Sequence, residues 1–474
     1  MTATSSPEIL ENALDAVARA ARPTARSAAA TRTGWLRHIA DSLDRASAEL
    51  IAIARAETHL TDTRLMNELR RTTFQARLFA DRLSTGSFSG VFIDPADADW
   101  PMGARPDLRR TFIPIGPVLV FTAGNFPFAF GVAGGDMVSA LTAGCPVLVK
   151  AHPGHPDLSR ATYRVVMDAL ADAGAPDGVF GMIEGEDAGR AAVLDSRIRA
   201  VGFTGSTSGG RALFDLAMSR PEPIPFYAEM SSTNPVIITP RSWATRPAEI
   251  AAGFAASLTA SAGQLCTKPG VVLVPDIRGF LDQLPGLPAA PMLNDHILDG
   301  FHRTTSKMAT QAAIARGELS AGEAAPVLFR TTIAEVQAHP ELLDLEMFGP
   351  AALLVEYAHV DQVMGVIDQL SGQLTASVHG GDQPDSQEAE LVARLAEHAG
   401  RVLWNDWPTG VSVTDAQQHG GPYPATTAPL STSVGTQAVW RFLRPVTFQN
   451  MPDEALPDGL RRNLESPSLA QEHA

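Results

Sequence analysis

Hydrophobic positions near the start of the chain recur at helical spacing. Leu10, Leu14 and Val17 fall on one face of a predicted helix. Ser6 followed by Pro7 is a start signal, because serine caps helices and proline suits the first helical position. A second helix is predicted where apolar residues recur in the same way, at Trp35, Ile39 and Leu43.

From about residue 112 the pattern changes to short apolar runs separated by glycine-rich turns and helical segments. This alternation is typical of βα units around a parallel sheet, so we predict an α/β fold. Strands are predicted at 117–121, 146–149, 200–203, 235–238, 271–274 and 351–355, and a helix at 132–143. The proline-rich stretch 277–291 is predicted to be a connection. Segment 440–448 is predicted to be an edge strand, because Pro445 has no amide hydrogen to donate.

Composition narrows the class of protein further. With 474 residues, 45% of them hydrophobic and 19% charged, the chain is an ordinary globular protein. A net charge of −15 without lysine or arginine runs argues against nucleic acid as a partner. The sequence contains no apolar run of about 18 residues or more, so no membrane span is predicted. Two cysteines and an acidic N-terminus without a signal-peptide pattern predict a cytoplasmic protein with free thiols.

Three side chains are candidates for chemistry, and each also has a structural interpretation. Cys266, between a helical stretch and an apolar strand, is either a nucleophile or a small buried residue, the commoner fate of a free cysteine. Glu229 is either a partly buried base with a raised pKa or a solvated charge at a strand end. Asn125, directly after a strand, either points its amide into the crevice at the carboxyl end of the sheet or shapes a turn.

Segment 203–210, FTGSTSGG, places glycines at a strand-to-helix turn. Since it is not the GxGxxG fingerprint, it is a modest indication of a dinucleotide site. Glycines there still allow backbone N–H groups to approach a diphosphate closely. They can also serve only to start the helix.

Six segments, taken in order, resemble the aldehyde dehydrogenase superfamily, and the resemblance extends from about residue 68 to residue 448. They are Asn-Phe-Pro at 125–127, Lys150, Phe-Thr-Gly-Ser at 203–206, Glu229, Gly-Gln-Leu-Cys at 263–266 and Glu-Met-Phe-Gly-Pro at 346–350. Longer strings are most similar to the 2-oxoglutarate semialdehyde (2,5-dioxopentanoate) dehydrogenases, whose relatives include a bacterial fatty-aldehyde dehydrogenase. These strings lie at 133–156, 220–235, 404–413 and 419–427.

This resemblance implies NAD(P)-dependent oxidation of a small aldehyde, with 2-oxoglutarate semialdehyde as the first choice, to a carboxylic acid. Cys266 would attack the aldehyde, Asn125 would hold the oxyanion, and Glu229 would activate the water that hydrolyses the thioester. Dehydrogenases for other semialdehydes or fatty aldehydes, a CoA-acylating relative and a catalytically silent protein are the alternatives. No metal is implied. Cofactor contacts are implied for Lys150, His152, Gly205, Ser206, Gly210, Glu346 and Phe348.

Two departures from the family pattern affect specificity. Residues 150–153 lack the glutamate of NAD-preferring members, so NADP is expected to be preferred over NAD, helped by His152 or Arg190. The segment at about 275–292 is shortened, which leaves the wall of the substrate funnel undefined. Lys268 can bind a substrate carboxylate, lower the pKa of the thiol or be a solvated lysine. Candidates for substrate binding are Arg70, Arg71, Phe128 and Lys268.

The likeness also implies a division of the chain. A Rossmann-like cofactor domain is expected at 1–95 and 113–228, an α/β catalytic domain at 229–434, and a small β bridging element at 96–112 and 435–452. A C-terminal tail is expected at 453–474. Bridging strands of this kind pair between subunits, so we expect a homodimer or a homotetramer.

Overall fold

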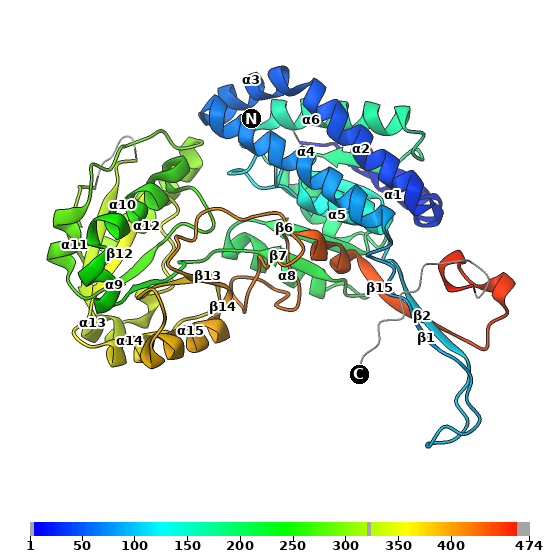
Figure 1. The fold of residues 1–474 in the computed structure, drawn as a ribbon. Coiled ribbons are helices and arrows are strands. Elements are labelled where there is room, and N and C mark those ends of the chain that lie inside the picture. The colour runs from blue at the N-terminus through cyan, green and yellow to red at the C-terminus, as the bar shows by residue number, and fades with distance from the viewer. Residues whose placement is uncertain (1–3, 320–323, 462–474) are drawn as a thin grey trace.

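Residues 4–319 and 324–461 are described by a computed structural model, whose arrangement is shown in Figure 1. Its first helix is capped as predicted, since the Ser6 hydroxyl accepts a hydrogen bond from the Ile9 amide over 3.3 Å. The residues predicted for the apolar faces of the first two helices are buried, except for Leu10, which is half-buried. Both helix predictions are therefore confirmed. The N-terminal helices are α1 (Pro7–Arg26), α2 (Ala29–Arg45), α3 (Ser47–Thr58) and α4 (Asp62–Ser84).

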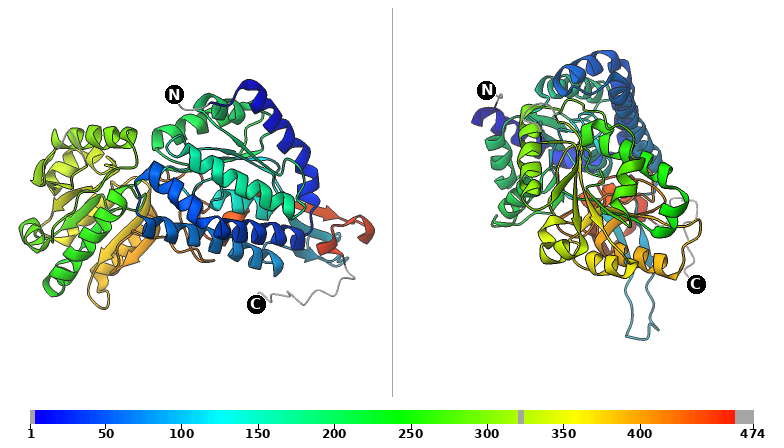
Figure 2. Two further views of the ribbon diagram at one scale, coloured as in Figure 1. Left: turned by 90° about the horizontal axis from the view of Figure 1, so that it is seen from above. Right: turned by 90° about the vertical axis from the view of Figure 1, so that its left-hand side faces the viewer.

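A five-stranded parallel sheet follows, in the order β5-β4-β3-β6-β7. Because β3 pairs with both β4 and β6, the chain leaves the middle of the sheet in two directions, which opens a crevice at the carboxyl ends of these strands. Helix α2 packs on α4, α5 and α6, and α4 also packs on α5 (Figures 1 and 2). The elements are β3 (Val118–Phe121), α5 (Gly135–Ala143), β4 (Val147–Lys150), α6 (Pro156–Asp172), β5 (Phe180–Ile183), α7 (Glu186–Leu194), β6 (Ala200–Thr204), α8 (Thr207–Met218) and β7 (Phe226–Glu229).

A second sheet of seven strands has the order β10-β11-β12-β9-β8-β13-β14 and forms the other lobe in Figure 1. Only its edge strand β10 runs antiparallel to its neighbour. The first elements of this lobe are β8 (Val236–Ile238), α9 (Pro240–Thr245), α10 (Pro247–Thr259), η1 (Ala260–Gly263), β9 (Val271–Val274), α11 (Ile277–Gln283) and α12 (Asp295–Ala309). The others are β10 (Ala313–Arg316), β11 (Val327–Thr332), α13 (Ile333–Ala338), η2 (Pro340–Leu342), β12 (Ala351–Glu356), α14 (Val360–Ile367), β13 (Gln373–His379), α15 (Ser386–His398) and β14 (Ala399–Trp404).

A third, antiparallel sheet is built from β1 (Phe92–Asp94), β2 (Leu108–Pro114) and β15 (Leu443–Gln449). β15 pairs only with β2, so the predicted edge position of Pro445 is confirmed. Figure 1 shows the hairpin of β1 and β2 extending away from both lobes, with β15 beside it. The strands of this third sheet come from two distant parts of the chain, before β3 and after β14. The division into domains at the predicted boundaries remains a proposal.

Two predictions about elements need correction. The stretch 277–291 is not entirely a connection, because its first half forms α11, capped by the Asp276 side chain. The strand predicted from residue 440 begins at Leu443, after the 3₁₀ segment η3 (Thr436–Phe442), which packs on α5. Two 3₁₀ turns, η4 (Asp453–Ala455) and η5 (Asp458–Leu460), lie in the predicted tail, and its remainder from 462 lies outside the described residues. Within the described ranges, no helix has both the length and the apolarity required to cross a bilayer.

Candidate active site

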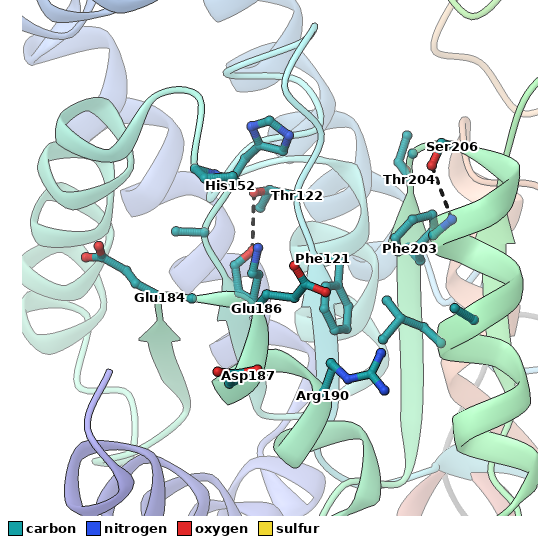
Figure 3. A pocket seen from close by; sticks show the side chains of 18 of the residues that line it. Phe121, Thr122, His152, Glu184, Glu186, Asp187, Arg190, Phe203, Thr204 and Ser206 are labelled. Atoms are coloured by element: carbon teal, nitrogen blue, oxygen red, sulfur yellow. Dashed lines mark hydrogen bonds between the residues drawn. The ribbon is translucent and has the colours of Figure 1, made fainter. Parts of the chain in front are cut away.

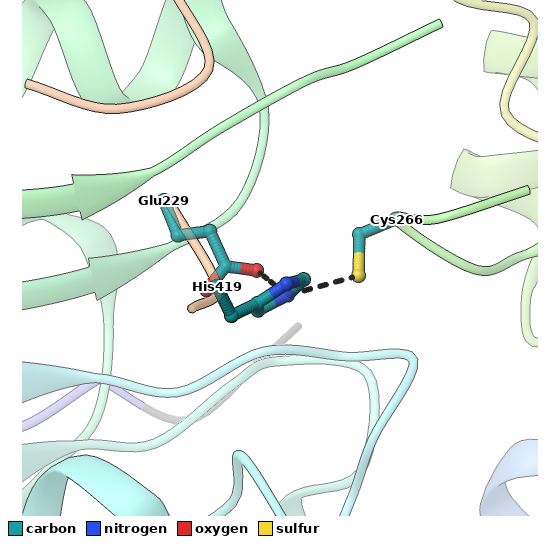
Figure 4. A group of neighbouring side chains, drawn as sticks. All are labelled: Glu229, Cys266 and His419. Carbon is teal, nitrogen blue, oxygen red and sulfur yellow. Dashed lines mark hydrogen bonds and ion pairs between the residues drawn. The ribbon is translucent and has the colours of Figure 1, made fainter. Parts of the chain in front are cut away.

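Three side chains from distant parts of the chain meet beside one cavity (Figure 4). Glu229 ends β7, Cys266 lies in the turn before β9, and His419 lies in the long segment after β14. His419 Nε2 lies 2.7 Å from Glu229 Oε1 and 3.6 Å from Cys266 Sγ. The imidazole therefore stands between the carboxylate and the thiol. Cys266 keeps part of its surface exposed and lines the cavity, which is not the position of a core residue.

The turn that carries Cys266 has an unusual backbone. Ser261, Ala262 and Gly263 have φ values of 50°, 54° and 68°, three consecutive residues in the left-handed region. A Cβ atom on Gly263 would lie 2.3 Å from the backbone of Gly349, so only glycine fits this approach. This close contact fixes the turn against the loop before β12.

Asn234 holds the other side of the nucleophile. Its side-chain amide donates to the carbonyl oxygens of Cys266 at 2.8 Å and of Lys268 at 2.9 Å. Since Asn234 is 1% exposed, these hydrogen bonds are made out of water. The peptide of Cys266 is therefore held in place before any substrate arrives.

Burial and charge act against each other at Glu229 and His419. Burial raises the pKa of the Glu229 carboxyl, but the charge of His419 and the hydroxyl of Ser433 hold the pKa below its usual range. Burial likewise lowers the pKa of His419, but the charges of Glu229 and Cys266 raise the pKa to about 10. The prediction of a raised pKa for Glu229 is therefore wrong, because the charged partner His419 lies far away in the sequence and could not be recognised there.

This ion pair makes stability depend on pH. The pKa of His419 is 6.5 ordinarily and about 10 in the folded chain, so folding gains from the charged imidazole below pH 6.5 and loses that gain as pH rises toward 10. We expect the stabilising effect of His419, measured against His419→Gln in urea unfolding, to fall by at least about 1 kcal/mol between pH 7 and pH 9. The exposed His339→Gln serves as control. Parallel pH profiles of wild type and His419→Gln would contradict the assignment.

Asn125 follows β3 and lines the same cavity as Cys266. Its side-chain amide donates to the carbonyl oxygen of Gln264 at 3.0 Å. The structure therefore brings Asn125, Glu229 and Cys266 together, and adds His419, which sequence reasoning missed. The string at 419–427 was noted only for its likeness to relatives, since a histidine in a loop has no local pattern that indicates its partners.

A second cavity, of about 620 Å³, lies at the carboxyl ends of β3, β4 and β6 (Figure 3). Lys150 ends β4, and Gly205 and Ser206 form the turn before α8, where the N-terminal end of the helix favours an anion. Its volume and lining suit a dinucleotide. The residues present therefore fit the nicotinamide cofactor implied by the sequence, and Lys150, Gly205 and Ser206 are placed where they can hold it.

Two predicted cofactor residues have other surroundings than expected. Burial, together with the charges of His155 and Lys150, lowers the pKa of His152 to about 3, so its ring is neutral and offers no charge to a phosphate. Gly210 does not line the cavity; a Cβ there would lie 2.7 Å from Met230 Sδ, so this glycine permits close packing of α8 on the sheet. Its neighbour Gly209 lines the cavity instead.

Glu346 and Phe348, from the loop before β12, line the catalytic cavity as expected for cofactor contacts. Lys268 does not: it is 2% exposed, and its ammonium donates to the carbonyl oxygen of Ala351 at 2.6 Å. Burial, offset in part by the charge of Glu346, lowers the pKa of Lys268 to about 8. The two interpretations of Lys268 as a ligand of the substrate carboxylate and as a solvated lysine are therefore both wrong.

The remaining substrate candidates also separate. Phe128 is 2% exposed and belongs to the core around α2, α4 and α5, so its assignment to the substrate site is wrong. Arg70 is exposed, with its side chain outside the two cavities described above. Arg71 is half-buried and lies on the side of α4 that faces the catalytic groups.

The family model described as the aldehyde dehydrogenase family matches residues 2–423, which include all four catalytic candidates. The chain belongs to the aldehyde dehydrogenase family. It is therefore an oxidoreductase that acts on aldehydes and uses a nicotinamide dinucleotide.

Similar proteins support the same family. The chain is 44% identical over 454 residues to alpha-ketoglutaric semialdehyde dehydrogenase 2 of Azospirillum brasilense, covering 92% of this chain and 85% of that protein. It is 40% identical over 442 residues to the alpha-ketoglutaric semialdehyde dehydrogenase of Acinetobacter baylyi, with 91% and 84% covered.

Solved structures show the same fold. A 1-pyrroline-5-carboxylate dehydrogenase from Thermus matches with a TM-score of 0.79 at 19% identity, over 94% of this chain and 86% of that one. A glyceraldehyde-3-phosphate dehydrogenase of Methanocaldococcus jannaschii matches with a TM-score of 0.78 at 16% identity, over 94% and 95%. The expected aldehyde dehydrogenase fold is thus confirmed.

Proposed function

We propose that this aldehyde dehydrogenase oxidises 2-oxoglutarate semialdehyde (2,5-dioxopentanoate) to 2-oxoglutarate. The observation that carries a hydrolytic dehydrogenase is the contact series from Glu229 through His419 to Cys266 beside the dinucleotide cavity. The substrate is supported by the names of the relatives from Azospirillum brasilense and Acinetobacter baylyi.

A substrate panel tests this function. We expect the highest kcat/KM for 2-oxoglutarate semialdehyde among this compound, succinic semialdehyde, glutaraldehyde, pentanal and decanal. A preference for decanal would contradict the substrate and favour the fatty-aldehyde alternative. Stimulation of turnover by CoA would contradict the hydrolytic step and favour an acylating enzyme.

The chain's own groups account for the covalent steps. The sulfur of Cys266 forms a bond to the aldehyde carbon, and the side chain of Asn125 with the amide of Cys266 stabilises the charge that develops on the aldehyde oxygen. The Asn125 amide donates to the carbonyl oxygen of Gln264, which belongs to the same turn as Cys266. A nicotinamide dinucleotide held by Lys150, Ser206 and Glu346 would supply the acceptor for the hydride of this carbon. A thioester on Cys266 is the result.

Glu229 and His419 handle the protons of the second step. Water attacks the thioester carbon, the C–S bond breaks, and the proton of the water passes to the pair formed by His419 and Glu229. His419 contacts both the thiol and the carboxylate, so it is placed to carry a proton between the two. We therefore propose His419 as a second proton-handling residue, beside Glu229.

The choice between NADP and NAD depends on charges around the second cavity. The sequence predicted NADP because no glutamate follows Lys150 closely. Three carboxylates nevertheless line this cavity, Glu184 directly after β5 and Glu186 and Asp187 in the first turn of α7, together with the cation Arg190 (Figure 3). Arg160 engages Glu184 at 2.6 Å. We propose that NADP binds through Arg190 and that NAD is accepted at least equally well.

Exchange of these charges should change the cofactor ratio. We expect Arg190→Ala to lower the ratio of kcat/KM for NADP over NAD by about tenfold, because one charged hydrogen bond to the 2′-phosphate is lost. Glu186→Gln should raise the same ratio, since a carboxylate that repels the phosphate is removed. Initial rates with both dinucleotides measure the ratio. An unchanged ratio in both variants would mean that the 2′-phosphate of NADP does not lie near Arg190 and Glu186.

We further propose that the protein is a cytoplasmic homodimer or homotetramer. The hairpin of β1 and β2 exposes large apolar side chains, with Phe92 60%, Trp100 44% and Met102 91% exposed. Such a surface is typical of a subunit contact. Sedimentation at several protein concentrations would measure the assembly.

A further inference from the structure

One face of α4 carries an unbalanced positive charge. Arg64, Glu68 and Arg71 are four and three residues apart, so they share this face. Glu68 is neutralised twice, since it pairs with Arg64 at 2.6 Å and accepts two hydrogen bonds of 2.9 Å from backbone amides of the loop after β3. Arg71 has no ion-pair partner within the described residues. A guanidinium without an ion-pair partner among the described residues therefore remains beside the catalytic groups.

Two aromatic rings lie between this face of α4 and His419 of the catalytic site. Phe126 and Phe130 follow Asn125 and pack with their ring centroids 5.6 Å apart. Arg64 lies 4.6 Å from the centroid of Phe126, and Arg71 lies 5.6 Å from that of Phe130. Phe130 in turn lies 6.5 Å from the ring of His419.

Neither arginine nor either ring belongs to the walls of the two cavities described above. The group therefore approaches Cys266 from a side other than that of the dinucleotide. The charge of Cys266 is close enough to raise the pKa of Arg71, against the larger lowering of that pKa by burial. A substrate that lies along the packed pair of rings would have its aldehyde at the thiol and its far end at the arginines.

Both arginines have N–H groups that await a partner. Arg64 Nη2 and Arg71 Nη1 are buried and have no hydrogen-bond partner among the described residues. Arg71 Nη2 makes only a long contact of 3.4 Å, to the carbonyl oxygen of Val411. Buried charged donors without acceptors are costly, and a carboxylate satisfies two of them at once. The Arg64 side chain keeps 23% of its surface exposed, so an anion can reach it.

We propose that Arg64 and Arg71 form the subsite that binds the terminal carboxylate of the substrate, and so select short aldehydes that carry a carboxylate at the other end. This inference rests on the proposed function and deepens it. An uncharged aldehyde would leave the guanidinium N–H groups unpaired, and a site of that kind discriminates strongly against such a molecule. The neighbouring Arg70 has no part in the subsite.

Arg71→Gln tests the subsite, with the exposed Arg70→Gln as matched control on the same helix. We expect Arg71→Gln to lower the ratio of kcat/KM for 2-oxoglutarate semialdehyde over pentanal by about 10- to 100-fold, mostly through KM, because a charged hydrogen bond is lost. Arg64→Gln should lower the same ratio, and Arg71→Lys should restore part of it. Arg70→Gln should leave it unchanged.

Glutarate, used as an inhibitor of pentanal oxidation, separates this inference from the proposed function. We expect wild type and Arg70→Gln to be inhibited competitively with respect to pentanal, and Arg71→Gln to require about tenfold more glutarate. If wild type does not prefer the semialdehyde over pentanal, the proposed function is wrong, while the glutarate result still decides the subsite. Equal losses for both aldehydes in Arg71→Gln, with unchanged glutarate inhibition, would overturn the subsite.

Discussion

Cys266→Ser should lower kcat for aldehyde oxidation by at least about 10³-fold, because a hydroxyl is a far weaker nucleophile than a thiolate at neutral pH. Spectrophotometric detection of the reduced dinucleotide, with 2-oxoglutarate semialdehyde or pentanal, measures the loss. Since the side chain keeps its size, the cavity and the contacts of His419 should be preserved. The catalytically silent alternative predicts no turnover in wild type either.

Cys145→Ser is the matched control for the nucleophile. Cys145 is completely buried, and its thiol donates to the carbonyl oxygen of Phe442 at 3.4 Å. Burial raises the pKa of Cys145 to about 11, so this thiol stays protonated and unreactive at neutral pH. We expect Cys145→Ser to keep its activity, and iodoacetamide to modify one thiol in the folded wild type. Equal losses in both variants would argue that folding, and not nucleophilicity, is responsible.

Glu229→Gln should lower the steady-state kcat by about 10²- to 10⁴-fold, because the amide cannot accept a proton from the attacking water. Formation of the thioester does not require the carboxylate. A rapid-mixing experiment should therefore show about one equivalent of reduced dinucleotide per Cys266, followed by slow turnover.

The control for this substitution is Glu222→Gln, which removes a carboxylate paired with Arg199 at the surface. It should behave as wild type. If Glu229→Gln loses the first equivalent together with the turnover, the carboxylate acts before the thioester forms, and His419 would have to be the base of the second step.

Much of the fold could be predicted from burial alone. Central strands of both large sheets, such as β3, β8 and β9, are covered on two faces, so they are continuous apolar runs, and β9 was predicted at its observed bounds. In these two sheets β5, β7, β10, β11, β13 and β14 were not predicted, since glycine or polar residues interrupt their apolar patterns. α11 was missed because it is short and lies in a proline-rich stretch.

The site was only partly predictable for a different reason. Cys266, Glu229 and Asn125 lie in strings that resemble the family, so their residue types and order could be found. The surroundings of Lys268 and His152 could not, because their burial depends on packing between segments distant in sequence. The same holds for His419, whose partners come from 153 and 190 residues earlier in the chain.

The left-handed turn before Cys266 sets the stability of the fold against the turnover rate of the enzyme. Non-glycine residues in that conformation cost on the order of 1 to 3 kcal/mol each, and Ser261 and Ala262 both adopt it. Glycine at either position would relieve this local energy and also widen the range of orientations open to the thiol. Selection for thermal stability would therefore tend to enrich glycine at position 261 or 262. The more stable variants would have a lower kcat.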